Sequence, residues 1–136
     1  MRQRRCLVPA TGYYEWSKRG GAKQPYLISL KSGALFSFAG LWETWAGAAG
    51  EVRTFTIITT EPNALMARLH DRMPAIIARD HYAHWLDPSL QDPAKIQPMI
   101  ACYPAEAMQA VPISARINDV RNQGAELIAP AGAPLE

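Results

Sequence analysis

The sequence predicts an α+β fold: a curved, mostly antiparallel sheet or partial barrel with short flanking helices. Hydrophobic residues make up 49% of the 136 residues, which is enough to build the core of one domain over residues 1–136. Apolar and polar residues alternate through much of the first half, as they do in half-buried strands. The helical patterns are few and short, and they follow the strands instead of alternating with them.

Strand-like segments fill the first sixty residues. Thr11 and Gly12 are expected to form a turn, residues 31–33 a hairpin connection and residues 46–51 a loop. Pro9 is expected to end the first strand, because proline cannot donate to a sheet ladder. The expected strands are residues 5–8, 13–16, 25–30, 34–42 and 52–60.

Short helical segments come next. Thr60 offers an N-cap and Pro62 suits a first turn, so residues 63–69 are expected to form a helix that ends before His70. The remaining expected elements are a buried strand at 74–78, helices at 80–86 and 92–100, a strand from Val111 and a loose end over 129–136.

Charge, cysteines and hydropathy limit the class of protein. The formal net charge is only +2, although Arg2, Arg4 and Arg5 gather at the start of the chain. Cys6 and Cys102 form no Cys-x-x-Cys pair and no disulfide framework, so a reducing cytoplasm is the expected setting. No apolar stretch approaches the roughly 18 residues that a membrane-spanning helix needs.

Two residues are candidates for proton transfer. Glu15 lies between Tyr14 and Trp16, with Tyr13 close, so its carboxylate is expected to be partly desolvated, which suits a general acid or base. His70 follows a helix, and an imidazole that titrates near neutrality can move protons. The alternatives are a glutamate on the polar face of an edge strand and a histidine that caps a helix.

Other candidates have weaker patterns. His81 and His84 lie one helical turn apart and could hold a metal, but no third ligand accompanies them at a familiar spacing, so a solvated helix face is favoured and no metal is expected. Cys6 could act as a nucleophile with His70 as its base, as in a thiol peptidase. Its apolar neighbours favour packing instead, and the same holds for Cys102.

A phosphate-binding track with stacking platforms is a further possibility. The arginines that could form it are Arg4, Arg5, Arg68, Arg72, Arg116 and Arg121, and the aromatic residues are Tyr13, Trp16 and Trp42. The alternative is a set of scattered surface arginines and core aromatics.

Five stretches of the sequence, in order along the chain, resemble one known family. They are RRCLVPATGYYEW, AGLWETW, TFTIITTEPN, LHDRMPAII and PISARINDVRNQGAEL. Together they resemble the SRAP family, the SOS response-associated peptidases or abasic-site processing proteins. Five ordered motifs are far more specific than any one of them, and they cover most of the chain, from residue 4 to residue 130.

The resemblance implies a protein that binds single-stranded DNA carrying an abasic site and links to it covalently in the DNA damage response. In the family, an N-terminal cysteine attacks the ring-opened sugar aldehyde, its amine forms a Schiff base and its thiol closes a thiazolidine. Glu15 matches the glutamate that acts as acid or base beside that amine. His70 matches the histidine that helps to open the sugar ring and supports reversal. The resemblance also implies a possible autopeptidase activity and no cofactor.

The resemblance assigns DNA-binding roles more loosely. The arginines would hold flanking phosphates, and the tryptophan would occupy the space of an unstacked base. The threonine and asparagine come from the family's TT-x-x-N stretch and would bond a phosphate or a catalytic side chain. The residues expected to bind DNA are Arg4, Arg5, Trp16, Thr59, Asn63 and Arg72.

The sequence departs from the family at its start. Family members open with Met-Cys-Gly-Arg and continue to an Asn-Ala-Arg motif, and roughly the first 80 to 90 residues of such a domain are expected to be missing here. Cys6 matches an interior cysteine and does not replace the nucleophile. A misplaced gene start, a truncated relic that binds DNA weakly, or a separate completing peptide would each explain this, and the first is favoured.

Three other readings of the whole chain stay open beside the SRAP interpretation. The chain could be a non-catalytic module that binds single-stranded DNA, a thiol peptidase that uses Cys6 and His70, or a folding fragment with no activity. Lost strands would expose sheet edges and apolar surface, so the chain is expected to fold poorly or to associate. Its enzymatic status and oligomeric state are not predicted.

Overall fold

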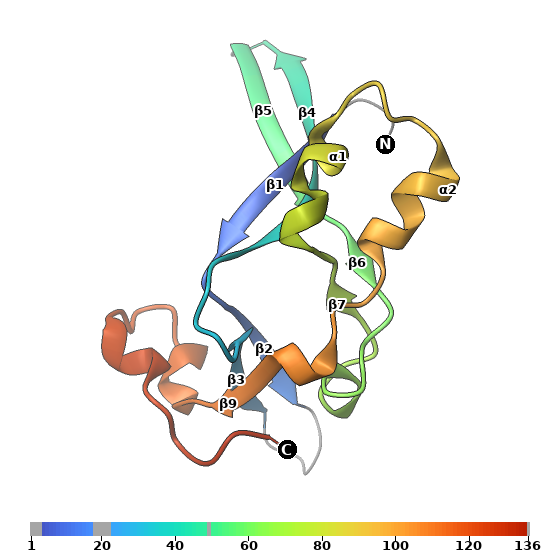
Figure 1. Cartoon of the computed structure of the whole chain (residues 1–136). Helices are drawn as coiled ribbons and strands as arrows, with labels where there is room; N and C mark the ends of the chain where they lie inside the picture. The colour runs from blue at the N-terminus through green and yellow to red at the C-terminus, as the bar shows by residue number, and fades with distance from the viewer. Residues whose placement is uncertain (1–3, 18–22, 49, 136) are drawn as a thin grey trace. The chain divides into compact units, whose positions relative to one another are not determined.

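The structure is a computed structural model that describes residues 4–17, 23–48 and 50–135 (Figure 1). These residues fall into two compact units. Each unit combines an antiparallel sheet with short helices, so the predicted α+β class is confirmed. The described residues form no closed barrel.

The first unit is built around one long strand, β4. Its first five residues are buried, because β1 pairs with one edge of this part and β8 with the other. The outer part of β4 pairs with β5, and every pairing in this sheet is antiparallel. The unit contains residues 4–10, 36–61 and 74–103, and its strands are β1 (Arg5–Ala10), β4 (Phe36–Gly47), β5 (Gly50–Ile57) and β8 (Ile76–Ile77).

Short helices supply the core of this unit. Trp85 and Ile96 lie in one buried cluster with Ala39 of β4. The chain enters α2 at Asp92, whose carboxylate accepts a hydrogen bond from the N–H of Ala94 at 3.0 Å, as an N-cap does. The helices are η2 (Arg79–His81), α1 (Tyr82–Leu86), α2 (Pro93–Ile96) and η3 (Gln97–Ile100), where η marks a 3₁₀ helix.

The second unit carries a sheet in the order β2-β3-β9, again antiparallel. Ile28 of the central strand is fully buried, and Met108 and Ile113 are almost so. The unit contains residues 11–35, 62–73 and 104–135, with strands β2 (Tyr13–Ser17), β3 (Gln24–Leu30) and β9 (Met108–Pro112) and helices η1 (Met66–Arg68), η4 (Ala105–Ala107), η5 (Ala115–Asn118) and η6 (Ala125–Ile128). The two-residue strands β6 (Thr59–Thr60) and β7 (Met73–Pro74) lie where the chain passes from one unit to the other.

Strand boundaries and partners differ from expectation at three places. β1 continues through Pro9, because β1 is an edge strand and tolerates a residue that cannot donate on its free side. Residues 31–33 are not a hairpin connection, since β3 pairs with β2 and β9. The expected loop at 46–51 is mostly strand, because β4 extends to Gly47 and pairs there with Gly50.

The helical and terminal segments also differ from expectation. The helix expected over 63–69 shortens to η1, which covers three residues. The end of the chain, expected to be loose, is hydrogen-bonded along β9: Ala131 N–H donates to Pro112 O and Leu135 N–H to Ala110 O, each at 2.8 Å. Within the described ranges, no helix is both long enough and apolar enough to cross a bilayer.

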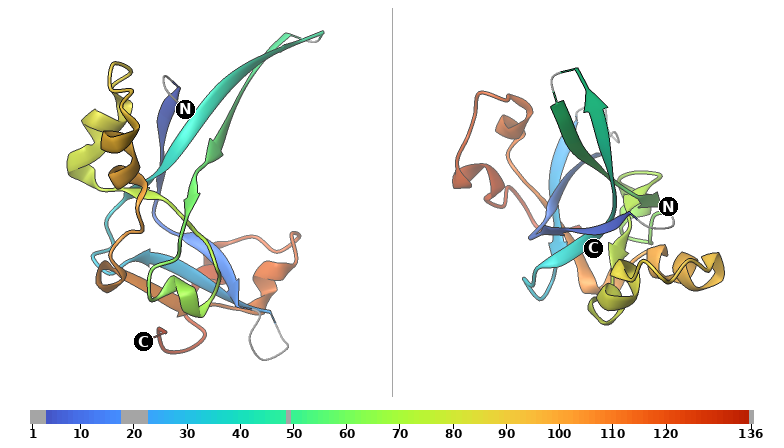
Figure 2. Two further views of the ribbon diagram at one scale, coloured as in Figure 1. Left: turned by 90° about the vertical axis from the view of Figure 1, so that its right-hand side faces the viewer. Right: turned by 90° about the horizontal axis from the view of Figure 1, so that it is seen from above.

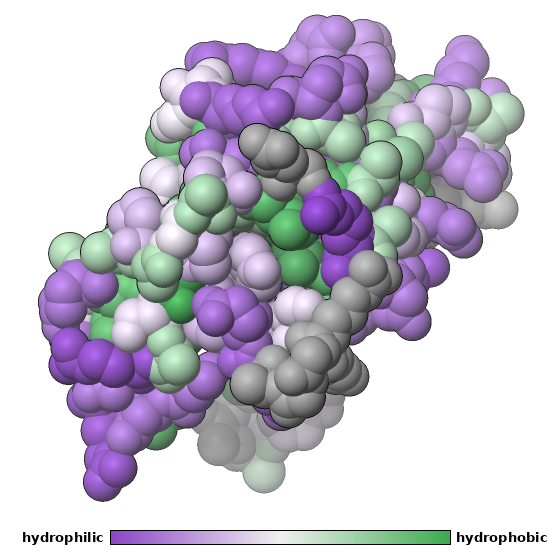
Figure 3. Space-filling model, turned by 90° about the horizontal axis from the view of Figure 1, so that it is seen from below, coloured by the Kyte–Doolittle hydropathy of each residue, from purple (hydrophilic) through white to green (hydrophobic). Residues whose placement is uncertain are grey.

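Apolar side chains also reach the surface. Figure 3 shows one face of the molecule, where hydrophobic residues in green lie among hydrophilic residues in purple. The large apolar residues that are more than half exposed include Leu35, Trp45, Phe55 and Val120. Val120 is 90% exposed, and it lines a pocket of the second unit.

Candidate active site

The strand β2 positions Glu15 at the edge of the second unit's sheet. Aromatic residues with high strand propensity flank Glu15, and it pairs with Tyr26 of β3. A carboxylate oxygen of Glu15 accepts a hydrogen bond from the backbone N–H of Trp16 at 2.9 Å. This bond holds the carboxylate close to its own strand.

Tyr13 lies on the same face of β2 as Glu15, two residues away. Burial raises the pKa of its phenol far above the ordinary value, and the negative charge of Glu15 adds to this shift. The phenol therefore stays protonated beside the carboxylate at any physiological pH.

His70 follows η1, and buried residues of that segment fix its position. Its backbone N–H donates to Met66 O at 2.8 Å, and Met66 and Leu69 are buried. Asn63, only 7% exposed, starts the segment: its side-chain oxygen accepts from Met66 N–H at 2.9 Å, and its amide nitrogen lies 3.3 Å from Met108 Sδ. The asparagine therefore orients the histidine's segment from inside the unit.

The imidazole of His70 has two alternative partners at one nitrogen. Nδ1 accepts a hydrogen bond from the backbone N–H of Arg72 at 3.1 Å, and it also lies 3.0 Å from a carboxylate oxygen of Asp71. One nitrogen cannot accept and donate at once, so the first contact needs Nδ1 without a proton and the second needs a proton on Nδ1. The side chain is 38% exposed and can exchange protons with solvent.

Glu15 and His70 line the same pocket, which has a volume of about 560 Å³. All of its walls belong to the second unit. The structure thus brings a carboxylate and an imidazole from distant parts of the chain to one cavity, together with an exposed lysine. The lining residues are Glu15, Trp16, Lys23, His70, Ile117, Asn118 and Val120.

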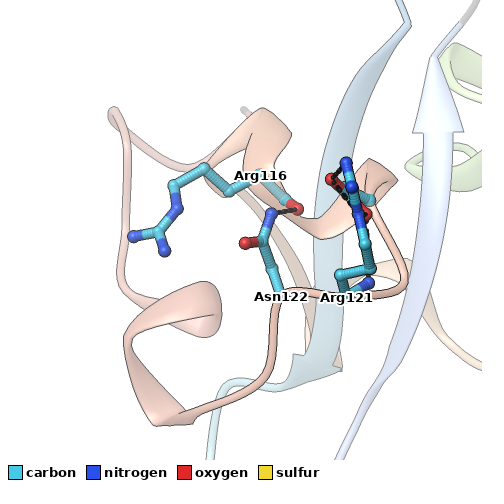
Figure 4. A network of polar contacts seen from close by, with 4 residues as sticks. Arg116, Arg121 and Asn122 are labelled. Carbon is cyan, nitrogen blue, oxygen red and sulfur yellow. Dashed lines mark hydrogen bonds and ion pairs between the residues drawn. The ribbon is translucent and has the colours of Figure 1, made fainter.

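One wall of the pocket is the turn from Ser114 to Asn122. Trp16 Nε1–H donates to Asn118 Oδ1 at 2.7 Å, which ties this wall to β2. Figure 4 shows how the turn is held: Asn122 donates to Arg116 O at 2.8 Å, and Arg121 forms an ion pair with an aspartate. The aspartate is Asp119, at 2.7 Å, and the hydrogen bonds from Arg121 lower the pKa of its carboxyl group.

The first unit holds three of the predicted DNA contacts. Arg4 is exposed, forms an ion pair with Glu43, and lies with its guanidinium carbon 5.5 Å from the ring centroid of Trp42. Arg5 is 6% exposed, and its guanidinium donates to backbone oxygens of residues 85, 87 and 90. Thr59 is exposed.

Arg72 of the second unit is exposed, so its side chain can reach a ligand in solution. His81 and His84 were considered as metal ligands. Among the described residues, no three histidine, cysteine, aspartate or glutamate side chains lie close enough together to hold a metal ion. Burial raises the pKa of the Cys6 thiol, which disfavours the thiolate that a thiol peptidase needs.

Sequence reasoning missed part of the pocket. Lys23, Ile117, Asn118 and Val120 received no role, although the last three lie inside the PISARINDVRNQGAEL stretch. That stretch could have pointed to the pocket wall, because a run of polar and turn-forming residues between short apolar ones is typical of a structured loop. The sequence could not predict a role for Lys23, because its place at the pocket depends on how β3 pairs with β2.

Comparisons with known proteins agree with the motifs. The family model of the SOS response associated peptidase (SRAP) matches residues 1–120. The abasic site processing protein YoaM of Bacillus subtilis (strain 168) is 45% identical over 127 residues, which cover 92% of this chain and 56% of that protein. The abasic site processing protein HMCES of Gallus gallus is 33% identical over 159 residues, covering 100% of this chain and 47% of that protein.

A solved structure has the same fold. The crystal structure of a protein from Bacteroides thetaiotaomicron aligns with a TM-score of 0.87 and 35% identity, over 96% of this chain and 58% of that one. The chain therefore spans about half the length of the relatives that it matches.

Proposed function

The chain belongs to the SOS response associated peptidase (SRAP) family, and we propose that it takes part in the processing of abasic sites in DNA. The observation that carries this proposal is the pocket shared by Glu15 and His70. Relatives that are 33% and 45% identical are named abasic site processing proteins. Both units contribute to the residues matched by the family model, so we treat them as parts of one SRAP domain.

We propose that the DNA is single-stranded and that the link to it is covalent. An abasic sugar opens to an aldehyde at C1′, and a primary amine adds to this carbon to give a carbinolamine. Loss of water gives an imine, and addition of a thiol to the imine carbon closes a thiazolidine. The amine and thiol would come from the N-terminal cysteine that the family resemblance implies.

Glu15 and His70 would supply the proton transfers of these steps. A carboxylic acid at Glu15 would protonate the departing hydroxyl of the carbinolamine, and the resulting carboxylate would take a proton from the nitrogen. Neutral His70 would carry its proton on Nε2, so Nδ1 would accept the proton of the sugar hydroxyl during ring opening and give up its bond to the Arg72 N–H, and the new Nδ1–H would donate to Asp71. The exposed Lys23 would attract the phosphate beside the lesion.

The same two groups would serve the peptidase activity that the family name implies, because amide cleavage also needs proton transfer to the leaving nitrogen. We place this chemistry in the reducing cytoplasm, since Cys6 and Cys102 are both free thiols.

A crosslinking assay on a denaturing gel tests the proposal. The chain, and a version extended to begin Met-Cys-Gly-Arg, are each mixed with single-stranded DNA that holds one abasic site. A heat-stable shifted band is expected with the extended version. Glu15→Gln should slow its formation by roughly 10²- to 10⁴-fold, the usual contribution of a positioned acid or base. His70→Asn should slow the reaction on ring-closed sites.

Matched controls separate catalysis from folding. Glu106→Gln and His84→Asn change exposed residues outside the pocket and should leave the rate unchanged. Equal rates for Glu15→Gln and Glu106→Gln would remove the catalytic role. Salt-sensitive binding without any adduct from either version would favour the non-catalytic DNA-binding module instead.

A further inference from the structure

The β4–β5 hairpin carries large apolar side chains on both of its faces. Trp42 and Phe55 are directly opposite each other on one face, and Trp45 and Val52 on the other. Trp45 is 62% exposed, Val52 48% and Phe55 61%. Figures 1 and 2 show the tip of this hairpin extending away from α1 and α2. The elements of the first unit thus leave these side chains uncovered.

The outer edge of β5 is open to pairing. The sheet order is β1-β4-β5, and the described part of the chain places no strand beyond β5. About half of the backbone N–H and C=O groups in β5 therefore point away from β4 without a strand partner. Exposed edges are commonly blocked by proline, a bulge or several charges. β5 has no proline, its register with β4 is unbroken from Gly50 to Ile57, and its charged residues are Glu51 and Arg53.

These two charges make the edge self-complementary. Glu51 and Arg53 lie two residues apart on the same face and form an ion pair at 3.1 Å. In an antiparallel pair of two β5 strands centred on Val52, each Arg53 is directly opposite Glu51 of the second copy. We propose that the outer edge of β5 binds the same edge of a second copy of this chain in this register.

The same register also brings apolar residues of the two copies together. On one face of the resulting four-stranded sheet, Trp45, Val52, Val52 of the second copy and its Trp45 form a continuous row across the strands. The two ion pairs lie on the opposite face. Stable interfaces bury about 800 Å² on each partner, and a single strand edge supplies less, so the dimer dissociates on dilution.

Analytical ultracentrifugation over a range of protein concentrations tests the proposal. The wild-type chain should show a concentration-dependent monomer–dimer equilibrium. Arg53→Glu and Glu51→Arg each place like charges opposite each other and should weaken the dimer by roughly tenfold. The double variant Glu51→Arg/Arg53→Glu restores opposite charges and should return the dissociation constant close to the wild-type value.

Arg121→Glu is the matched control, because it also breaks an exposed ion pair but lies in the second unit. It should leave dimerisation unchanged. A chain that stays monomeric at every concentration would overturn the proposal, and so would a dimer that neither single charge reversal weakens. Thermal unfolding of each variant confirms that it folds, since exposed ion pairs contribute little to stability.

Cysteine crosslinking tests the register independently. In a Cys102→Ser background, Val52→Cys places two thiols directly opposite each other and should give a covalent dimer on mild oxidation. Thr54→Cys, on the same face of β5, would be opposite Gly50 of the second copy and should crosslink poorly. The reverse order of reactivity would contradict the register, and binding of an extended peptide instead of a second copy would leave both variants monomeric.

Discussion

At the scale of single residues, Arg5 and Cys6 show how adjacent positions of one strand acquire different chemistry. Arg5 is opposite Leu41, and its guanidinium is held among backbone carbonyl groups near the end of α1. Cys6 points to the other face, where it lines a groove with Trp42 and Phe55. The Arg5 guanidinium is therefore held inside the unit by backbone oxygens, and the Cys6 thiol is partly enclosed by apolar side chains.

The two cysteines should differ in their reaction with a thiol reagent. Cys102 is exposed, so the expectation that it packs in the core was wrong. Cys6 is half-buried, and burial raises the pKa of its thiol. A raised pKa means less thiolate at every pH below it, so Cys6 should react several-fold more slowly than Cys102 at pH 8. Stopped-flow absorbance with a disulfide reagent should show two phases, and the slow phase should accelerate as the pH rises.

Single-cysteine variants assign the two phases. Cys102→Ser should retain only the slow phase, and Cys6→Ser only the fast one. A fast phase in Cys102→Ser would mean that Cys6 is an accessible thiolate. That result would revive the thiol peptidase alternative with His70 as the base.

At the scale of elements, the close approach of β1 and β4 depends on Gly40. A Cβ added there would lie 2.7 Å from Cys6 Sγ, 3.1 Å from Val8 Cγ2 and 3.2 Å from Cys6 O. The two strands are paired in register at this position, Cys6 opposite Gly40, so the added carbon has little room.

Gly40→Ala should destabilise the chain by about 1–3 kcal/mol, the usual cost of overpacking. Part of this loss should be recovered in Cys6→Ala/Gly40→Ala, because the double variant removes the sulfur atom that makes the shortest contact. Urea unfolding followed by tryptophan fluorescence gives the coupling free energy. Gly33→Ala tests backbone strain without a steric clash. A Cβ at Gly33 meets nothing within 4 Å, so any loss of stability there comes from the φ of +70°, which strains residues other than glycine. Equal costs for the double and the single Gly40 variants would contradict the steric explanation.

Local pattern predicted the elements better than their partners. The aromatic residues in 13–16 and the alternation in 25–30 correctly predicted β2 and β3. It could not show that β3 pairs with β9, more than seventy residues away, because register and partner depend on tertiary packing. The same limit applies to Pro9, whose place inside β1 depends on β1 being an edge strand.

For the candidate site, too, the sequence predicted individual residues better than their tertiary contacts. Glu15 and His70 were found from their neighbours and from the family motifs, and the pocket that they share supports the pairing. Asn63 was expected to contact a ligand or a catalytic side chain, and the structure shows it buried and bonded within its own unit. Burial of a polar side chain depends on partners from distant segments, here Met108, which a linear pattern does not reveal.

At the scale of the whole molecule, the predicted DNA contacts are divided between the two units. Arg4, Arg5 and Thr59 belong to the first unit, and Arg72 belongs to the second with the pocket. The formal net charge of +2 gives little general attraction for DNA, so binding has to come from local groups.

The salt dependence of DNA binding reports how many phosphates the protein neutralises. Each phosphate neutralised on a single strand contributes roughly −0.7 to the slope of log K against log salt concentration. The slope should be about −2.8 if Lys23, Arg4, Arg5 and Arg72 all bind phosphates, and about −2.1 if Arg5 keeps its carbonyl partners. We expect the slope of smaller magnitude, because the buried guanidinium of Arg5 would have to leave several backbone oxygens unpaired to reach a phosphate.

Fluorescence anisotropy with a labelled oligonucleotide that holds one abasic site measures the slope. Arg72→Gln should reduce its magnitude by about 0.7, whereas Arg79→Gln, an exposed arginine with no predicted contact, should leave it unchanged. A wild-type slope of about −2.8 would mean that Arg5 gives up its carbonyl partners on binding. In that case the end of α1 would have to rearrange with it, and DNA binding would be coupled to the core of the first unit.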